Sequence, residues 1–271
     1  MRHRFATVPE VLASAAQRYG DSPAIVTAGG TESFRELLRS TRATAAALGR
    51  RGLRPGDRAL MAADNSPALV HAWLGTIWAG GIPAAVNPQL TATEMAYLRE
   101  DLAPAVTLLG DEIDAIDSEP AESETASDQA DPFSVAAIVY TSGTTSRPKG
   151  VMVRHAAYTE SGASFPGWLG LRGPQRLWAC LPLFHINAQA YSLMGALAHG
   201  FPLALTPKFH ASTFWQEARG LQVTEVNVVG AMLEFLHRMR GWNLRCAPSM
   251  QLRDQRPRCE MSSRSASGSA S

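Results

Sequence analysis

The chain of 271 residues is poor in cysteine and nearly neutral in charge. Its three cysteines, Cys180, Cys246 and Cys259, are odd in number and show no CxxC spacing, which argues against a disulfide framework or a zinc site. The formal net charge of +1 does not favour a nucleic-acid or acidic-membrane partner. Residues 1–4 are basic, but no apolar core of signal-peptide length follows them, so we expect a cytoplasmic protein.

Charge is missing from one long stretch, residues 177–207, which contains no Asp, Glu, Lys or Arg over 31 positions. That length would admit a membrane span. The stretch nevertheless contains Pro182, His185, Asn187 and Gln189, which hydrocarbon tolerates poorly, so we expect no membrane span. We predict instead a buried strand, a helix and a second strand, at residues 177–181, 188–198 and 203–206.

Lysine is scarce, since the chain has only Lys149 and Lys208 against 23 arginines. Lys149 closes the segment Tyr-Thr-Ser-Gly-Thr-Thr-Ser-Arg-Pro-Lys-Gly at residues 140–150, which lies between two predicted strands. Five of the six residues from Thr141 to Ser146 carry a hydroxyl, and the sixth is glycine. Hydroxyls and backbone N–H groups on such a loop suit phosphate oxygens, and the lysine adds a point charge. The alternative is a polar surface loop that ends in a Pro-Lys-Gly turn.

This segment does not match a Walker A motif, which would need glycine at Pro148 and Ser or Thr at Gly150. It resembles the phosphate-binding signature of the adenylate-forming superfamily, which includes acyl-CoA synthetases, aryl-CoA ligases and luciferases. Ser146 stands where glycine is usual in that signature. The resemblance implies a set of ATP-binding residues and makes Thr144 a candidate Mg²⁺ ligand. That set is Thr141, Ser142, Gly143, Thr144, Thr145 and Lys149.

Helices and strands alternate along residues 1–240, with helix-capping boxes beginning at Thr7 and Ser33. This alternation predicts an α/β fold of mainly parallel sheets with flanking helices. The resemblance, which residues 53–58 and 78–88 also support, implies an incomplete N-terminal domain of an adenylate-forming enzyme over residues 1–240.

Two segments lack a periodic apolar pattern. Residues 111–131 carry nine acidic side chains and no basic one, which predicts a flexible solvated linker or, alternatively, an acidic binding tail. Residues 241–271 contain five arginines and end in a serine-rich run, and we expect a disordered or non-native tail there.

The sequence Leu-Pro-Leu-Phe-His-Ile-Asn-Ala-Gln at residues 181–189 resembles the next motif of the superfamily. Its wording is similar to ligases of the crotonobetaine/carnitine and short-to-medium acyl type. The resemblance implies that His185 and Gln189 line an acyl pocket, together with Gly230 after the predicted strand at residues 223–229. The alternative for His185 is a core histidine satisfied by backbone groups.

The activity that the resemblance implies is ATP-dependent activation of a small carboxylic acid as an acyl-adenylate, followed by transfer to coenzyme A. ATP, Mg²⁺ and coenzyme A are the implied cofactors. The superfamily's later Tyr-Gly-x-Thr-Glu segment, ribose-binding Asp and catalytic Lys find no match here, so we expect a truncated chain of low or no activity. The alternatives are a non-catalytic remnant that binds a nucleotide or acyl acid, and an unrelated ATPase. The acid and the oligomeric state stay open.

Overall fold

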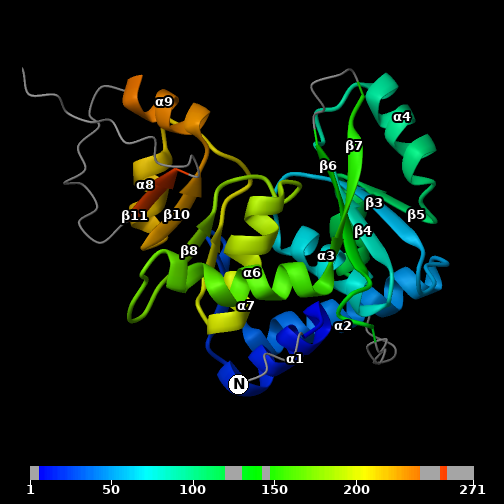
Figure 1. Cartoon of the computed structure of the whole chain (residues 1–271), viewed down its shortest axis with the longest axis horizontal. Helices are drawn as coiled ribbons and strands as arrows, with labels where there is room; N and C mark the ends of the chain where they lie inside the picture. Colours follow the sequence, from blue (N-terminus) through cyan, green and yellow to red (C-terminus); the bar gives the residue numbers. More distant parts are fainter. Residues whose placement is uncertain (1–5, 120–129, 142–146, 239–250, 255–271) are drawn as a thin grey trace, which may run out of the picture.

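The structure is a computed structural model that describes residues 6–119, 130–141, 147–238 and 251–254 (Figure 1). Within these ranges the strands form a six-stranded, a three-stranded and a two-stranded sheet. All neighbouring strands of the two larger sheets run parallel, apart from the β1–β2 pair. The predicted α/β fold with mainly parallel sheets is therefore confirmed.

The six-stranded sheet has the order β11-β10-β8-β9-β1-β2. Its strands are Pro23–Thr27 (β1), Gly30–Ser33 (β2), Leu177–Ala179 (β8), Leu203–Leu205 (β9), Glu225–Val228 (β10) and Gln251–Asp254 (β11). Every residue of β8, β9 and β10 is buried. Such continuous burial is typical of parallel strands that are covered on both faces.

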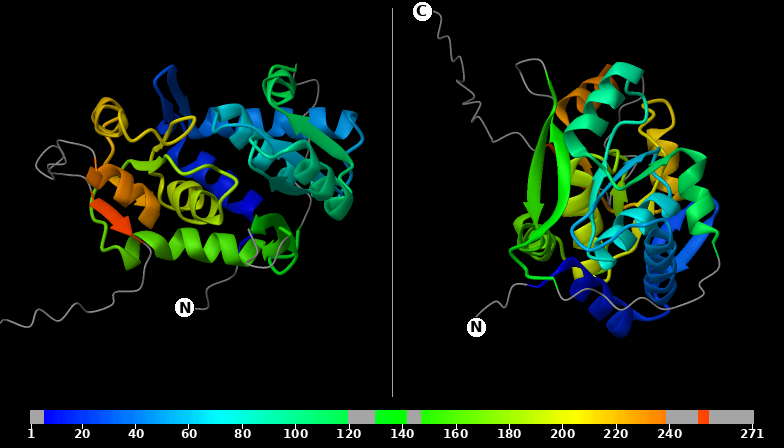
Figure 2. Two further views of the ribbon diagram at one scale, coloured as in Figure 1. Left: turned by 90° about the horizontal axis from the view of Figure 1, so that it is seen from above. Right: turned by 90° about the vertical axis from the view of Figure 1, so that its right-hand side faces the viewer.

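The three-stranded sheet has the order β4-β3-β5, and the two-stranded sheet is the antiparallel hairpin β6–β7. The strands are Arg58–Ala62 (β3), Ile82–Ala85 (β4), Val106–Leu109 (β5), Val135–Thr141 (β6) and Lys149–Arg154 (β7). Strand β6 lies beside β4, and Ile138 and Tyr140 of β6 pack on a buried cluster that includes Leu60 and Leu98. The right-hand view of Figure 2 shows the hairpin standing as a layer beside the smaller sheet.

The helices of the first half begin where the sequence predicts. Both predicted capping boxes, Thr7 with Glu10 and Ser33 with Glu36, are present. Helix α3 is buried along nearly its whole length, which makes it the central helix of the core. The helices of this half are Val8–Tyr19 (α1), Phe34–Arg50 (α2), Pro67–Trp78 (α3), Ala92–Leu102 (α4) and Asp111–Asp117 (α5).

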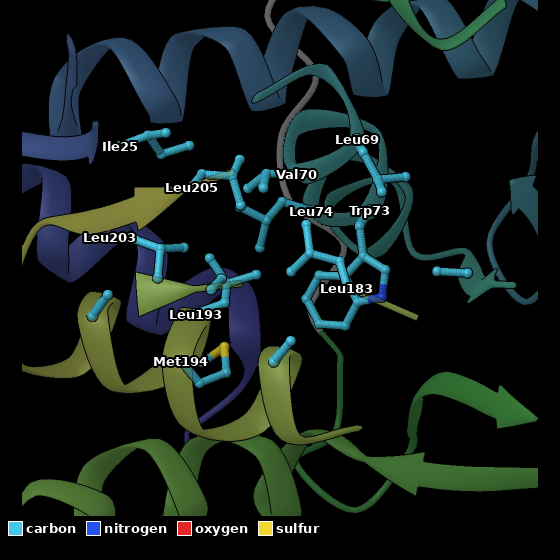
Figure 3. Close-up of a cluster of buried hydrophobic side chains, with 14 of the residues drawn as sticks. Ile25, Leu69, Val70, Trp73, Leu74, Leu183, Leu193, Met194, Leu203 and Leu205 are labelled. Carbon is cyan, nitrogen blue, oxygen red and sulfur yellow. The ribbon is translucent and has the colours of Figure 1, made fainter. Parts of the chain in front are cut away.

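The core joins the two halves of the chain. Figure 3 shows Val70 and Leu74 of α3 facing Leu205 of β9, with Leu193 and Met194 below them. The surrounding helices of the second half are His155–Trp168 (α6), Met194–His199 (α7), Phe214–Gly220 (α8) and Gly230–Arg238 (α9). The predicted helix at residues 188–198 is present, but its first part, Ala188–Leu193 (η1), is π-helical.

The uncharged stretch of residues 177–207 folds as a strand, a π-helical turn, a short helix and a strand. Its predicted elements are therefore confirmed in type. Among the described residues, no helix is both long and apolar enough to cross a membrane.

The prediction of a flexible acidic segment from residue 111 is wrong for its first part. Helix α5 occupies Asp111–Asp117, and its side chains Ile113 and Ile116 are buried at 1% exposure each. Isoleucines three positions apart lie on one face of a helix, so this short pattern suffices for docking. Glu119 then forms ion pairs of 2.7 and 2.8 Å with two arginines at the end of α2. Residues 120–129 lie outside the described part.

The expected tail after residue 240 also contains one element that the sequence does not predict. Strand β11 at Gln251–Asp254 pairs in parallel with β10, from Glu225 opposite Gln251 to Val228 opposite Asp254. A strand edge can recruit four residues through backbone hydrogen bonds without any apolar period in them. The rest of the tail lies outside the described residues, and the boundary at residue 240 stays a prediction.

Gly162 allows α6 to pack closely on the start of α7. A Cβ atom there would lie 2.6 Å from the backbone carbon of Met194. Because backbone cannot yield as a flexible side chain can, we expect Gly162→Ala to lower the free energy of unfolding by about 1–3 kcal/mol. Gly167→Ala is the matched control in the same helix, since nothing lies within 4 Å of a Cβ there. The control should be neutral or stabilising in urea unfolding, and equal losses in both variants would contradict the packing argument.

Candidate functional site

The β6–β7 hairpin brings two predicted phosphate-binding residues together. Thr141, the last residue of β6, is the register partner of Lys149, the first residue of β7. Both residues are exposed. The predicted residues Ser142, Gly143, Thr144 and Thr145 lie outside the described residues. The hairpin thus presents a hydroxyl and an ammonium group at the base of a serine- and threonine-rich connection.

Gly150 keeps the base of this hairpin narrow. A Cβ atom at Gly150 would lie 3.0 Å from Cγ2 of Ile138 and 3.4 Å from the ring of Tyr140 on the facing strand. Such contacts are tighter than side chains normally make, so a larger residue would displace the side chain of Ile138 or Tyr140 next to Lys149. The glycine of the Pro-Lys-Gly sequence therefore has a packing reason.

Two tyrosine hydrogen bonds, one from β6 and one from α4, join helix α4 to the loop end of the hairpin. The Tyr140 hydroxyl donates to Asp101 at 2.7 Å, and the Tyr97 hydroxyl donates to the carbonyl of Pro148 at 3.3 Å. Burial and the Asp101 carboxylate raise the pKa of Tyr140 well above its usual range, so its proton stays in place. These contacts hold the strand ends that carry Thr141 and Lys149.

A second cation lies beside this bracing contact. The Arg147 guanidinium sits 5.1 Å from the centre of the Tyr97 ring, within cation–π range. Arg147 and Lys149 thus place two positive charges near the base of the hairpin, two residues apart in sequence. The local field favours an anionic ligand although the whole chain is nearly neutral.

The second group of predicted site residues is His185, Gln189 and Gly230. They lie on segments that follow strands β8 and β10 of the six-stranded sheet. Strands β8 and β10 are parallel neighbours, so the segments that leave their carboxyl ends begin side by side. The chain leaves β8 toward β9 and leaves β10 toward β11, which lie on opposite sides. Right-handed crossovers then carry the two connections to opposite faces of the sheet. In open parallel sheets this divergence creates the crevice in which ligands bind.

Side-chain contacts of β8 agree with two covered faces. Leu177 lies against Gly195 of α7, with its Cδ1 atom 3.4 Å from the position of a Cβ there. The next residue, Trp178, packs on Phe214 of α8 with ring centres 4.8 Å apart. Figure 1 shows α7 on one side of β8 and α8 on the other. The carboxyl ends of β8 and β10 therefore lie between helices of both layers.

His185 lies on the segment that follows β8. The residue is exposed, and none of the described residues hydrogen-bonds its ring; its nearest aromatic neighbour is Phe184, with ring centres 4.5 Å apart. This placement excludes the alternative of a core histidine satisfied by backbone groups. Partial burial lowers the pKa of His185, which favours the neutral imidazole near pH 7.

Gln189 is buried and its amide is hydrogen-bonded within the chain, while its place in an acyl pocket stays a prediction. Its side chain is 1% exposed, accepts a hydrogen bond from Tyr158 at 2.5 Å and donates to the carbonyl of Leu183 at 2.6 Å. Burial raises the pKa of Tyr158 well above its usual range, so the phenol remains a donor. The amide of Gln189 therefore fastens the segment that carries His185. Gly230, the first residue of α9, lies two residues beyond the end of β10.

The arrangement of hairpin and sheet edge can be compared with known proteins. Residues 12–267 match the protein family described as "AMP-binding enzyme". The chain belongs to this family. The match extends beyond residue 240, to which the sequence resemblance had been confined.

The relatives of this AMP-binding chain include acid–CoA ligases. It is 28% identical over 257 residues to the medium/long-chain-fatty-acid–CoA ligase FadD6 of Mycobacterium tuberculosis, covering 85% of the chain and 43% of that relative. It is 27% identical over 219 residues to a crotonobetaine/carnitine–CoA ligase of Salmonella paratyphi B, covering 68% of the chain and 42% of the ligase. The chain thus spans less than half the length of these curated relatives.

Solved structures agree on the fold. The o-succinylbenzoate coenzyme A synthetase MenE of Bacillus subtilis, in complex with ATP and magnesium ion, superposes with a TM-score of 0.75 at 25% identity. The match covers 84% of this chain and 51% of the synthetase. This likeness supports the prediction of an N-terminal portion of an adenylate-forming enzyme.

The AMP-binding chain also contains a site residue that sequence reasoning missed. Asn65 is buried at 3% exposure, and its side chain donates to the carbonyls of Ala179 and Leu181 at 3.2 and 3.0 Å. Its side-chain oxygen accepts a hydrogen bond from the backbone N–H of Leu183 at 2.7 Å. The backbone N–H of Asn65 donates to the carbonyl of Pro207. Asn65 thereby fixes the start of the segment leading to His185. The available signal was an asparagine shortly after the strand at residues 58–62. Its hydrogen-bond partners, however, lie more than 110 residues away in the chain.

Two hollows in the described part lie apart from these residues. One, of about 430 Å³, is lined by residues of α1, α6 and α7, including Glu10, Arg18 and Thr159. The other, of about 360 Å³, lies between the β1–β2 turn and α2, with His71 in its wall. Neither contains a predicted site residue.

Proposed function

We propose that this chain carries the phosphate-binding and acid-binding parts of an ATP-dependent acid–CoA ligase that acts in the cytoplasm. The observation that carries the proposal is the pairing of Thr141 with Lys149 at the base of the hydroxyl-rich connection. The family match and the names of the relatives support the reaction class. The substrate is a small carboxylic acid of the acyl type, with fatty acids as one class that a relative's name suggests.

The proposed reaction has two steps. The carboxylate attacks the α-phosphate of ATP, and pyrophosphate leaves. The thiol of coenzyme A then takes the acyl group from the acyl-adenylate, and AMP and the thiol proton leave. Lys149, Thr141 and the neighbouring hydroxyls would bind oxygens of the leaving pyrophosphate, where negative charge develops. A general base is unnecessary in the first step, because a carboxylic acid is already ionised near neutral pH.

Magnesium would accompany the nucleotide. In the described part, no cluster of three or more His, Cys, Asp or Glu side chains could hold a metal ion. Protein sites often hold Mg²⁺ with one or two side chains plus substrate phosphates. Thr144 is the proposed protein ligand, and the ion would neutralise charge on the phosphates. Lys149 and Thr141 would position those phosphates from the hairpin.

The acid would bind at the crevice between β8 and β10. His185 offers a neutral imidazole there, and Gly230 brings the N-terminus of α9 to the same edge. The residues from 177 to 207 contribute no charged side chain to this region. An uncharged acyl body therefore fits better than a second ionised group.

The 271-residue chain on its own has a second candidate role, binding without turnover. Its residues provide no counterpart of the glutamate, aspartate and lysine that the superfamily resemblance assigns to later steps. We propose that the isolated chain binds nucleotide or acid and exchanges pyrophosphate with ATP slowly or not at all. Robust ATP–pyrophosphate exchange by the purified chain would contradict this role and leave the ligase proposal standing.

The phosphate site is tested with the two lysines of the chain. Lys149→Ala removes a charge-assisted contact and should weaken binding of a non-hydrolysable ATP analogue tenfold to about a hundredfold, measured by isothermal titration calorimetry. Lys208→Ala is the matched control, because Lys208 pairs with Asp64 at 3.4 Å on the surface after β9. Its affinity should stay within about twofold of the unmodified chain. Equal affinity of both variants would remove Lys149 from the site.

A further inference from the structure

Asn187 carries a buried side-chain amide that the chain leaves unsatisfied. The residue is 6% exposed, and neither its Oδ1 nor its Nδ2 has a hydrogen-bond partner in the described structure. Buried polar groups are nearly always paired, and an unpaired amide is costly in the folded state. The contrast with Asn65 is direct, since that buried amide uses both of its ends. Asn187 therefore calls for an external partner.

The backbone around Asn187 is also unusual. The π-helical stretch η1 begins at the next residue, Ala188, and the Asn187 side chain makes no capping bond to it. π-Helical turns are rare in proteins and occur frequently at functional sites. Ile186 and Asn187 are themselves helical, with φ −59° and ψ −50° at Asn187, so its amide has no capping role.

Asn187 lies on the connection that leaves the carboxyl end of β8. It is two residues beyond the exposed His185, at the edge where the connections from β8 and β10 diverge. Open parallel sheets bind their ligands at such an edge. The buried amide and the exposed imidazole thus belong to one short segment at the proposed acid site.

We propose that Asn187 recognises a neutral hydrogen-bonding substituent, a hydroxyl or a carboxamide, on the acid that this chain binds. The inference rests on the proposed ligase function and names the class of its acid. An amide offers one acceptor and a donor group, which a hydroxyl or a carboxamide can match together. The surrounding residues 177–207 carry no charge that would pair with a second carboxylate or an ammonium group.

The same amide discriminates against unsubstituted fatty acids. A plain alkyl chain placed against Asn187 would leave the amide without a partner in the complex as well. Sites that contain a buried hydrogen-bonding group reject analogues that lack the matching group more strongly than apolar pockets reject small size differences. Asn187 therefore acts as a specificity-determining residue, and the reaction itself does not require it.

Access to the amide involves the preceding turn. Both amide atoms are covered in the free chain, so a ligand reaches them when the neighbouring segment moves. That segment carries His185 and Ile186, of which Ile186 is 42% exposed. The proposal therefore requires residues 185–186 to move when the acid binds.

The test compares acids of equal length on the full 271-residue chain. Octanoic acid, its positional hydroxyoctanoic acids and pimelic acid monoamide are titrated calorimetrically in the presence of Mg²⁺ and a non-hydrolysable ATP analogue. At least one hydroxy or amide acid should bind tenfold or more tightly than octanoic acid. Asn187→Leu, which has nearly the same shape, should reduce this preference to twofold or less and leave ATP-analogue affinity unchanged.

Thermal unfolding of the unliganded variant separates recognition from a structural role. Asn187→Leu should unfold at the same or a higher temperature, because it removes an unpaired buried amide. Asn65→Leu, the same substitution at a paired amide, should lower the unfolding temperature. The proposal is overturned if Asn187→Leu keeps the preference for hydroxy or amide acids. It is also overturned if the unmodified chain shows no such preference, or if Asn187→Leu is as unstable as Asn65→Leu.

Failure of the proposed function has a different signature. If the ATP analogue does not bind, or binds independently of Lys149, the ligase proposal fails whatever the acids show. If the analogue binds through Lys149 and the acids show no preference, only the role of Asn187 fails.

Discussion

Replacement of His71 by leucine is expected to lower the free energy of unfolding by about 3–5 kcal/mol at pH 6. The imidazole is 4% exposed and bridges two carboxylates, with Nδ1 2.7 Å from Asp117 and Nε2 2.9 Å from Glu32. Leucine would leave both carboxylates without this partner in the interior. The bridge joins α3 to β2 and α5, so its loss loosens three elements at once.

The stability of the unmodified chain should depend on pH through the same group. Burial alone would lower the pKa of His71, but hydrogen bonds to Asp117 and Glu32, and their charges, raise it to about 9. The folded pKa then exceeds the unfolded value of 6.5, so the protonated bridge stabilises the fold fully below pH 6.5. This stabilisation is lost as the pH rises from 6.5 through 9.

Urea unfolding between pH 6 and 9.5 measures both effects. The unmodified chain should lose stability over this range, while His71→Leu should start lower and show a flatter profile. His210→Leu is the control, because His210 is exposed, and it should change stability by less than about 0.5 kcal/mol. An unchanged pH profile in His71→Leu would show that the bridge is not the cause.

Asn65→Asp should be the second strongly destabilising change, by about 3–5 kcal/mol. The aspartate would keep the shape of the side chain and turn a donor into an oxygen. That oxygen would face the carbonyls of Ala179 and Leu181, which now accept from Asn65 at 3.2 and 3.0 Å. Loss of these bonds frees the segment that carries His185, so acid binding should weaken together with stability.

The matched control for this change is Asn87→Asp. Asn87 lies in an exposed turn and accepts one hydrogen bond, from the backbone N–H of Gln89 at 2.9 Å. Aspartate can accept the same bond, so the effect should stay below about 0.5 kcal/mol in chemical denaturation. Similar losses at positions 65 and 87 would mean that the buried amide of Asn65 does not organise the segment after β8.

Local signals predicted most of the fold. A hydroxyl residue three positions before a glutamate marks the starts of α1 and α2, because both capping bonds form within one turn. The scarcity of lysine drew attention to Lys149, and the hairpin register places it opposite Thr141. These features depend on neighbours in sequence, so the sequence contains what determines them.

Contacts between residues that lie far apart in the chain could not be predicted from the sequence. His71 meets carboxylates 39 and 46 positions away, and Asn65 meets backbone groups more than 110 positions away. The sequence also does not predict that the Gln189 amide hydrogen-bonds to Tyr158 and Leu183 inside the core, and its role in a pocket stays a prediction. A residue type and a motif position do not determine which way a side chain points. Helix α5 was not predicted because the acidic composition of residues 111–131 was given more weight than the helical spacing of Ile113 and Ile116.

The most direct test of the account is a crystal structure of the 271-residue chain with a non-hydrolysable ATP analogue and Mg²⁺. We predict that the nucleotide phosphates lie at the base of the β6–β7 hairpin, within hydrogen-bonding distance of Lys149 Nζ and the Thr141 hydroxyl. A nucleotide bound elsewhere, such as the groove between α1, α6 and α7, would contradict the central claim.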